Sequence, residues 1–296
     1  MEDTFGCEAN PTGNPIGGGP GYEGVDAAGD YDVATLDQLL SALAKARKGQ
    51  VVYIEQGARI EVTERVFTED VVIEIPEGVT LAGNRGREGS QGALIFSEAF
   101  RTRPMVRAMG PGVRISGLRL RGPDPKRRMA HHRRSFGDGE NRGHEYYYKF
   151  PVSDGIATEH PGLEVDNCEI SAWSHAGVLL RKSRDHHIHH NHIHHCQYHG
   201  LGYGACLDAA EAVVEANLFD WCRHHISATG RPGTGYEACY NLVLEHANGH
   251  SFDMHGGRDR EDGTDIAGDW MNVHHNTFRA PVVPVVIRGR PVNEAG

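Results

Sequence analysis

The residues best suited to chemistry stand in one short stretch near the end of the chain, His-Ser-Phe-Asp-Met-His-Gly-Gly at 250–257. Asp253 lies between His250 and His255, with two residues on one side and one on the other. Histidine changes its charge near neutral pH, and a carboxylate beside it can orient the ring. The stretch is therefore a candidate acid/base centre, although a chain with 20 histidines also brings some together by chance.

A repeat indicates which elements would position these residues. Segments of alternating apolar residues end in Asn at intervals of 24, 26, 24 and 35 residues, and these are Asn167, Asn191, Asn217, Asn241 and Asn276. A period near 24 with this alternation fits three short strands per coil. We therefore predict an all-β fold, a right-handed parallel β-helix solenoid with coils about 4.8 Å apart. The stacked Asn side chains are expected to hydrogen-bond along one turn.

The rest of the chain fits around this solenoid. Leucines at helical spacing predict a short capping helix at residues 34–49, with Thr35 as its N-cap. The helix would hide the apolar end of the first coil, as end caps do in repeat proteins. We expect an irregular segment at 1–29 and one β-helix domain at 30–296, with long loop insertions at 122–160 and 256–270.

Counting from each Asn places histidines of successive coils near one corner. They are His175, His199, His224, His225 and His250. Stacked coils would bring such rings about 5 Å apart, close enough to couple their titration. The column is a candidate acid/base site, and a plain surface stack of imidazoles is the alternative. Further candidates at this corner are Arg223 and Tyr203 for catalysis, and Arg181, Tyr236 and Glu237 for substrate binding.

Both insertions carry groups that suit an acidic sugar, because arginine binds carboxylates in bidentate fashion. Residues 122–150 hold seven Lys/Arg and four Asp/Glu, in a chain whose net charge is −10. Candidate substrate-binding residues are Arg133, Arg134, Tyr146, Tyr147, Tyr148 and Lys149 in the first insertion, and Arg258 and Arg260 in the second. The second insertion also carries Asp259, Glu261, Asp262, Asp265 and Asp269, which could bind Ca²⁺ without EF-hand spacing. No cofactor is required by the pattern.

Two other clusters favour structural interpretations. The stretch DHHIHHNHIHH at 185–195 looks like a metal-binding tract, but neighbouring residues of a strand point to opposite faces, so we predict no metal site there. Cys196 and Cys222 occupy equivalent positions in neighbouring coils. Packing as small side chains is favoured over a disulfide between them.

Composition excludes several classes of partner. The acidic balance lacks the basic footprint of a general nucleic-acid binder. No run of 18 apolar residues predicts a membrane-spanning helix. The first residues lack the basic and apolar regions of a signal peptide, so we expect a cytoplasmic protein, or an extracellular one if an export signal was removed. The oligomeric state is not indicated.

Residues 30–291 resemble the pectate-lyase-like β-helix superfamily, through the helix followed by KGQVVYIE, the turn GVTLAGNRG and the coils with Asn. That superfamily includes lyases, hydrolases, epimerases and binding proteins. HSFDMHGG also resembles a local motif of alginate C5-epimerases and related lyases, Tyr-Gly-x-Asp-Pro-His. Asp253 and His255 match it, and His250 stands in the place of the Tyr. The resemblance implies that these residues act around the C5 proton of a uronate.

These observations favour a carbohydrate-active enzyme that cleaves an acidic, uronate-containing polysaccharide by C5-proton abstraction and β-elimination. Arg223 or Arg258 would neutralise the carboxylate, and a neutral His250 or His255 would remove the proton. The alternatives are a uronate C5-epimerase, a glycoside hydrolase on the same fold, and a non-catalytic carbohydrate-binding β-helix. A hydrolase would need a carboxyl partner for Asp253, such as Asp208 or Glu237.

Overall fold

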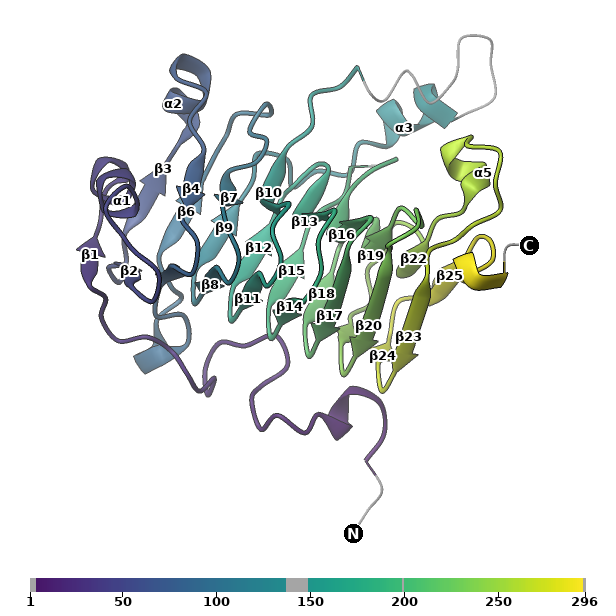
Figure 1. The fold of residues 1–296 in the computed structure, drawn as a ribbon, viewed down its shortest axis with the longest axis horizontal. Coiled ribbons are helices and arrows are strands. Elements are labelled where there is room, and N and C mark those ends of the chain that lie inside the picture. Colours follow the sequence, from purple (N-terminus) through teal and green to yellow (C-terminus); the bar gives the residue numbers. More distant parts are fainter. Residues whose placement is uncertain (1–3, 137–148, 199, 295–296) are drawn as a thin grey trace.

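The structure is a computed structural model, and it describes residues 4–136, 149–198 and 200–294. Within these residues the chain winds through three parallel sheets of nine, eight and eight strands (Figure 1). The all-β parallel β-helix predicted from the repeat is confirmed.

The three sheets run along the length of the molecule, and each coil contributes one strand to each of them. The first sheet contains β1 (Tyr31–Val33), β2 (Val51–Ile54), β5 (Thr80–Ala82), β8 (Arg114–Ser116), β11 (Glu164–Asp166), β14 (His186–His189), β17 (Glu211–Glu215), β20 (Gly235–Cys239) and β23 (Trp270–His274). The second contains β3 (Arg59–Glu61), β6 (Leu94–Phe96), β9 (Arg119–Arg121), β12 (Glu169–Ser171), β15 (His192–His194), β18 (Leu218–Asp220), β21 (Leu242–Val243) and β24 (Thr277–Phe278). The third contains β4 (Ile73–Ile75), β7 (Val106–Ala108), β10 (Asp154–Thr158), β13 (Ala176–Arg181), β16 (Tyr203–Asp208), β19 (His224–Ala228), β22 (Phe252–Met254) and β25 (Val285–Ile287).

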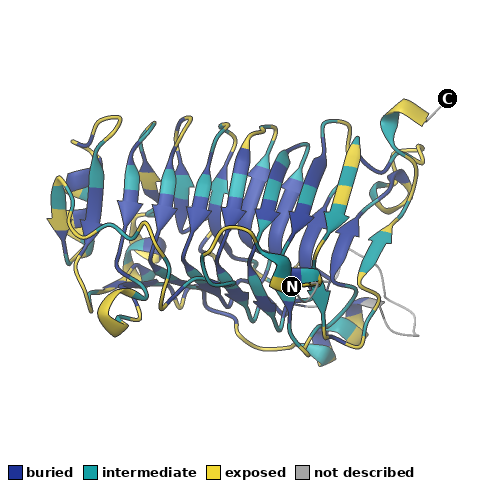
Figure 2. Cartoon of the chain, turned by 90° about the horizontal axis from the view of Figure 1, so that it is seen from below, coloured by how far each residue is buried: buried dark blue, intermediate teal, exposed yellow. Residues whose placement is uncertain are grey.

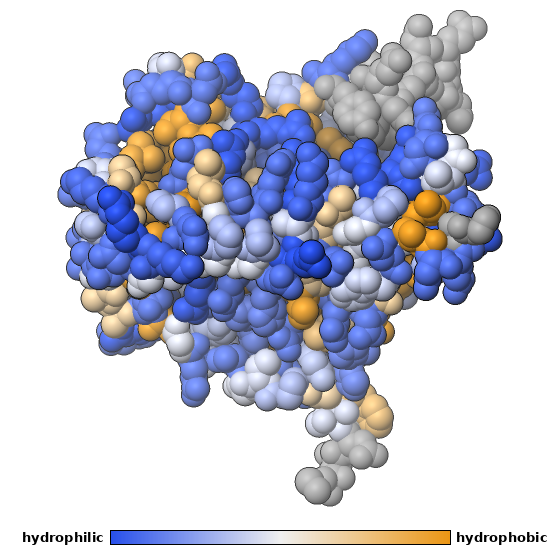
Figure 3. All heavy atoms as spheres, viewed as in Figure 1, coloured by the Kyte–Doolittle hydropathy of each residue, from blue (hydrophilic) through white to orange (hydrophobic). Residues whose placement is uncertain are grey.

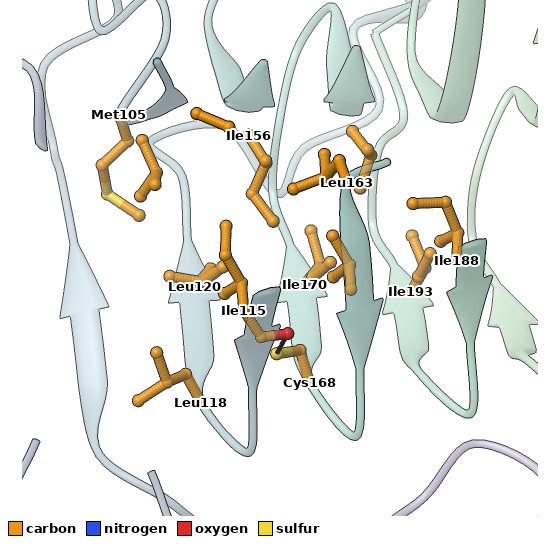
Figure 4. Close-up of a cluster of buried hydrophobic side chains, with 14 of the residues drawn as sticks. Met105, Ile115, Leu118, Leu120, Ile156, Leu163, Cys168, Ile170, Ile188 and Ile193 are labelled. Carbon is orange, nitrogen blue, oxygen red and sulfur yellow. Dashed lines mark hydrogen bonds between the residues drawn. The ribbon is translucent and has the colours of Figure 1, made fainter. Parts of the chain in front are cut away.

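The core lies inside the coils, where alternate residues of every strand point inward. Branched apolar side chains of neighbouring coils stack in columns, so that Val106, Ile156 and Val178 follow one another in the register of the third sheet. Figure 4 shows part of this core, where Ile115, Ile170 and their neighbours fill the space between the sheets. The inward positions are buried along most of the helix (Figure 2), while the face seen in Figure 3 is largely hydrophilic.

One helix caps the solenoid, and others lie outside its coils. They are α1 (Leu36–Leu43), α2 (Thr63–Thr68), α3 (Met129–Phe136) and α5 (Gly257–Arg260), with 3-10 turns at Gly6–Ala9, Arg87–Gly89 and Val292–Glu294. Thr35 caps α1 through a capping box with Gln38, as predicted, but the helix ends at Leu43 rather than 49. Leu39 and Leu43 enter the core beside the first strands. The predicted end cap is therefore present at the start of the solenoid (Figure 1).

The N-terminal segment lies along the outside of the coils (Figure 1). Within residues 4–29 it forms one 3-10 turn, and its contacts reach from Thr277 near the last coils to Asn167 and Arg85. The first strand, β1, begins at Tyr31. The first insertion ends earlier than 160, because β10 already belongs to the third sheet.

The asparagine ladder follows one turn of the coils. The side-chain amide of Asn191 donates to the Asn217 Oδ1 at 3.1 Å, Asn217 donates to Asn241 at 3.0 Å, and Asn241 donates to Asn276 at 2.9 Å. Asn167 stands one residue ahead of this column, since Glu169 pairs with His192 and Cys168 therefore occupies the ladder position. The Cys168 amide donates to the Asn191 Oδ1 in that position. The interval of 24 residues counted from Asn167 is therefore one residue too long, because the ladder position is Cys168.

No helix in the described part of the chain combines the length and apolarity needed to cross a membrane.

Candidate functional site

The outward face of the third sheet carries a cavity of about 380 Å³ between β13 and the end of β25. It is lined by His175, Gly200, Leu201, Tyr203, Cys206, Arg223, Ser227, Thr229, Arg231, His255, Asp259, Arg260 and Arg288. A second cavity of about 460 Å³ opens on the same sheet and includes Arg103, Arg107 and Arg181. Leu179 of the second cavity pairs in register with Cys206 of the first, so the two cavities adjoin along the sheet.

Asp253 is the centre of one cluster in this region. It is fully buried, and its Oδ2 lies 3.1 Å from the His250 Nε2, 3.2 Å from the His255 Nε2 and 3.0 Å from an Arg288 guanidinium nitrogen. The His224 Nε2 lies farther away, at 3.8 Å. A buried carboxylate is costly without a partner of opposite charge, and Arg288 supplies that charge here.

The backbone fixes which ring nitrogens of this cluster face the carboxylate. The His224 Nδ1 lies 2.6 Å from the His250 carbonyl oxygen, and the His255 Nδ1 lies 3.0 Å from that of Ala228. A carbonyl only accepts, so each Nδ1 donates its hydrogen and each Nε2 is turned toward Asp253. Both nitrogens of His255 thus face acceptors, and only the imidazolium form satisfies both.

Burial opposes that protonation. It lowers the pKa of His255, while the Asp253 carboxylate acts in the opposite direction. Burial also lowers the pKa of His224, reinforced by Arg223 and by the neighbouring imidazoles. The contacts of His255 with Asp253 and Ala228 favour the charged ring, and its burial favours the neutral ring. A group that exchanges protons must be able to adopt both forms.

A second histidine–carboxylate pair lies where the two cavities adjoin, with His175 lining the first cavity and Asp154 the second. The His175 Nδ1 lies 2.5 Å from Asp154 Oδ1, and the other oxygen of this buried carboxylate accepts from the Arg103 Nε at 2.8 Å. Because the Nδ1 hydrogen is directed to Asp154, the Nε2 of a neutral His175 carries a lone pair. His175 and Arg103 together hold the pKa of Asp154 below its usual range, against the effect of its burial.

A row of rings joins the two pairs. The rings of His175 and Tyr203 are 5.7 Å apart, those of Tyr203 and His224 are 5.8 Å apart, and those of His224 and His250 are 3.9 Å apart. Burial raises the pKa of Tyr203 to about 12, so its hydroxyl keeps its proton at neutral pH. Arg223 lies over this ring at 5.9 Å and donates to the Gly200 carbonyl.

The histidine column predicted at this corner is only partly present. His224 and His250 stack on neighbouring coils, but the preceding positions of that column hold Tyr203 and Ala176. His175 lies one residue before Ala176, because the spacing between the ladder and this column differs from coil to coil: Ala176 is eight residues after Cys168, Tyr203 twelve after Asn191 and His224 seven after Asn217. His199 lies outside the described residues.

Three candidates from the sequence lie away from the cavity. The ring of His225 is fully buried beside Phe219 inside the coil, and neither of its nitrogens has a hydrogen-bond partner among the described residues. Tyr236 is also inside the core, on β20 of the first sheet. Glu237 follows it on the outward face of that sheet, where it pairs with His274. None of the three lines the cavity on the third sheet.

His225 leads to a stability prediction. Burial lowers its folded-state pKa to about 3, below the value of about 6.5 in an unfolded chain. Between these values the unfolded state binds more protons, so His225 destabilises the fold as pH falls below about 6.5. We expect His225→Leu to gain roughly 2 kcal/mol at about pH 5 relative to about pH 8, as measured by urea unfolding at both values. An unchanged pH dependence would contradict the buried, neutral state of this ring.

The two insertions contribute unequally. Arg260 lines the cavity and donates to the Thr229 carbonyl, whereas Arg258 of the same helix is exposed. Arg181 lines the adjoining cavity. Arg133 and Arg134 are exposed on α3, and Lys149 is exposed after it. Tyr146, Tyr147 and Tyr148 lie outside the described residues.

Sequence reasoning missed two residues of the site. Asp154 opens β10 within a segment taken for an insertion, and Arg288 follows β25, the last strand of the third sheet. Both could be located only from the register between strands. Asp154 pairs with Ala176, the neighbour of His175, and Arg288 is two residues after Val286, which pairs with Asp253.

The acids considered for Ca²⁺ are engaged in separate contacts. Asp259 pairs with Arg288, Asp262 with Arg260 and Asp265 with Arg290. His224, His250 and Asp253 lie within the reach of one metal ion, but the Arg288 guanidinium already faces this carboxylate. The Arg288 guanidinium therefore supplies positive charge beside Asp253.

Comparison with known proteins finds a likeness among solved structures. No protein-family profile and no curated protein matches the chain. Among solved structures, an alginate lyase from Paenibacillus sp. str. FPU-7 is similar with a TM-score of 0.52 and 15% sequence identity, covering 82% of this chain and 74% of that one. At this identity the likeness shows the fold alone, and it agrees with the parallel β-helix described above.

Proposed function

We propose that this protein is a polysaccharide lyase that cleaves a uronate-containing polymer by β-elimination. The observation that carries the proposal is the cavity on the third sheet, where two histidines each lie against a buried carboxylate, His175 with Asp154 and His255 with Asp253. Elimination needs one group to take a proton and another to give one. Paired imidazoles in different environments suit these two roles.

In the proposed reaction His175 is the base. Its Nε2 takes the C5 proton of the uronate, the electrons of that bond form the C4–C5 double bond, and the bond from C4 to its glycosidic oxygen breaks. His255, in its imidazolium form, gives a proton to the departing oxygen. Asp154 and Asp253 orient the two rings and favour their positive charge.

Positive charge must also balance the uronate carboxylate, because neutralising it makes the C5 proton more acidic. Arg223 is the residue we assign to this role, since it lies in the cavity beside Tyr203. Arg258 is exposed and does not line the cavity, and Arg288 is held by Asp253 and Asp259. A guanidinium in such a site binds a carboxylate through two parallel hydrogen bonds.

The test is the ultraviolet absorbance of the unsaturated uronate that elimination produces. The protein would be incubated with alginate, pectate, glucuronan and glycosaminoglycans, with alginate first because the similar structure is an alginate lyase. We expect absorbance to rise with at least one polymer, and His255→Ala to lower that rate at least about 100-fold.

The control and the other outcomes separate the alternatives. His246→Ala should keep full activity, because this exposed histidine pairs with Asp220 outside the cavity. New reducing ends without absorbance would indicate hydrolysis instead. Exchange of the C5 proton with solvent, without cleavage, would indicate epimerisation, and binding without any reaction would reject an enzyme.

A further inference from the structure

A cluster of possible metal ligands lies on the first sheet, away from the residues of the proposed active site. Glu237 and Cys239 project from the same face of β20, two residues apart, and His274 on β23 pairs in register with Cys239. One carboxylate oxygen, the thiol sulfur and one imidazole nitrogen lie within 4.8 Å of one another. We propose that these three residues bind a zinc ion, with water in the fourth position.

The chemistry of the three donors points to zinc. Zn²⁺ accepts thiolate, imidazole and carboxylate ligands together in a tetrahedral arrangement, whereas Ca²⁺ and Mg²⁺ prefer oxygen alone. The His274 Nε2 lies 2.7 Å from the Glu237 Oε1, so these two ligands already converge, and an ion between them would replace the shared hydrogen. The Cys239 thiol is nearly buried, with 4% exposure, while Glu237 and His274 are about one third exposed, which leaves the ion a path from solvent.

The residues around the ligands also fit. The His274 Nδ1 lies 2.8 Å from the His275 Nδ1, which can accept its hydrogen and so direct the Nε2 lone pair to the metal. Glu215 pairs in register with Cys239 on the other side. Two carboxylates, those of Glu237 and Glu215, therefore stand on the strand of Cys239 and on its neighbour, and a divalent cation would offset their charge.

Two similar clusters on the molecule have an arginine nearby. Asp166, in the group with Glu164 and His189, receives two hydrogen bonds from Arg114 at 2.8 Å. In the group of Glu169, His192 and His194, Arg119 on β9 pairs in register with Glu169 on β12. No arginine or lysine forms an ion pair with Glu237 or Glu215 among the described residues.

Zinc at this position would join β23 to β20. β23 is the edge strand of the first sheet and the first strand after the 256–270 insertion. An ion that binds only the folded chain stabilises it in proportion to its affinity. Zinc would thus stabilise the pairing of β23 with β20, next to the long insertion that interrupts the repeat.

The experiment uses the metal-free full chain, titrated with Zn²⁺ against a chromophoric chelator and separately with Co²⁺. We expect one Zn²⁺ per chain, a thiolate-to-cobalt charge-transfer absorption in the near ultraviolet, and a rise in Tm with Zn²⁺. Cys239→Ser should abolish the cobalt absorption and weaken Zn²⁺ binding at least about 10-fold. The matched control is His189→Ala, in the cluster that Arg114 neutralises, and it should bind Zn²⁺ as the wild type does.

Zn²⁺ binding that Cys239→Ser leaves unchanged, or Co²⁺ binding without the charge-transfer absorption, would overturn the proposal. His274→Ala gives a second check, because it keeps the thiol and should also weaken binding. Circular dichroism of the metal-free variants shows whether each one is folded. The result is independent of the polymer assay, since none of these residues lines the cavity on the third sheet.

Discussion

His175→Ala is expected to lower kcat on the susceptible polymer by about 10²- to 10⁴-fold, the range over which a positioned general base acts. The reason is the geometry of His175: Asp154 takes the Nδ1 hydrogen at 2.5 Å, which leaves the Nε2 of the neutral ring as the proton acceptor. The measurement is the rate of unsaturated-uronate formation under saturating substrate, with binding followed separately by KM. Since His175 acts on the proton and not on substrate affinity, KM should change little.

The molecule contains a matched control for this variant. His246 also pairs with an aspartate, Asp220, at 3.1 Å, but it is exposed on the outside of the coils and does not line the cavity. His246→Ala should therefore keep the wild-type rate. Asp154→Asn should retain part of the activity and alter its pH profile, because the amide can still hold the ring but no longer supplies a negative charge. Full activity of His175→Ala, with loss of activity in His255→Ala, would transfer the role of base to His255.

The sequence predicts the architecture well because a solenoid repeats one local pattern. Each coil has the same alternation and the same turn, so the period near 24 could be read without knowing any contact between distant residues. The capping helix is equally local, since Thr35 and Gln38 form its start within four residues. The end of that helix was less predictable, because it depends on packing against β1 and β2.

The site is harder to predict, because it depends on register between coils. A shift of one residue turns a side chain to the other face of the strand. A fixed count from the ladder would place His175 in the column of His224, since each is seven residues after its ladder residue, Cys168 or Asn217. The register places Ala176 and Tyr203 in that column instead. His225 follows His224 directly, yet its ring lies inside the coil beside Phe219. Sequence spacing could not separate these cases.

The other contacts that the sequence did not predict join residues far apart in the chain. Asp253 was identified from its two neighbouring histidines, but the arginine that neutralises it comes from a different coil, 35 residues later. Asp154 likewise reaches His175 only because β10 and β13 are adjacent strands. The types of residue at the site were therefore predictable from the sequence, and their pairing required the three-dimensional register.

The largest expected effect on stability is at the centre of the asparagine ladder. Asn217→Ala should lower the free energy of unfolding by about 3–5 kcal/mol, because several buried groups lose their partners at about 1–3 kcal/mol each. The Asn217 side chain accepts from the backbone and side-chain nitrogens of Asn191 at 3.0 and 3.1 Å. It also donates to the Ile188 carbonyl at 2.8 Å and to Asn241 at 3.0 Å. Equilibrium unfolding in urea would measure the loss, with the m-value as a check on two-state behaviour.

The end of the same ladder provides the comparison that tests the cause. Asn276 accepts from Asn241 in the same way, but it is only partly buried, so water can replace the lost amide. Asn276→Ala should therefore cost only about 1 kcal/mol. The loss of unfolding free energy in each variant would then depend on how deeply the asparagine is buried, and not only on how many hydrogen bonds it makes. Equal losses in the two variants would contradict this, and would mean that the coils tolerate an unpaired amide as well inside the stack as at its end.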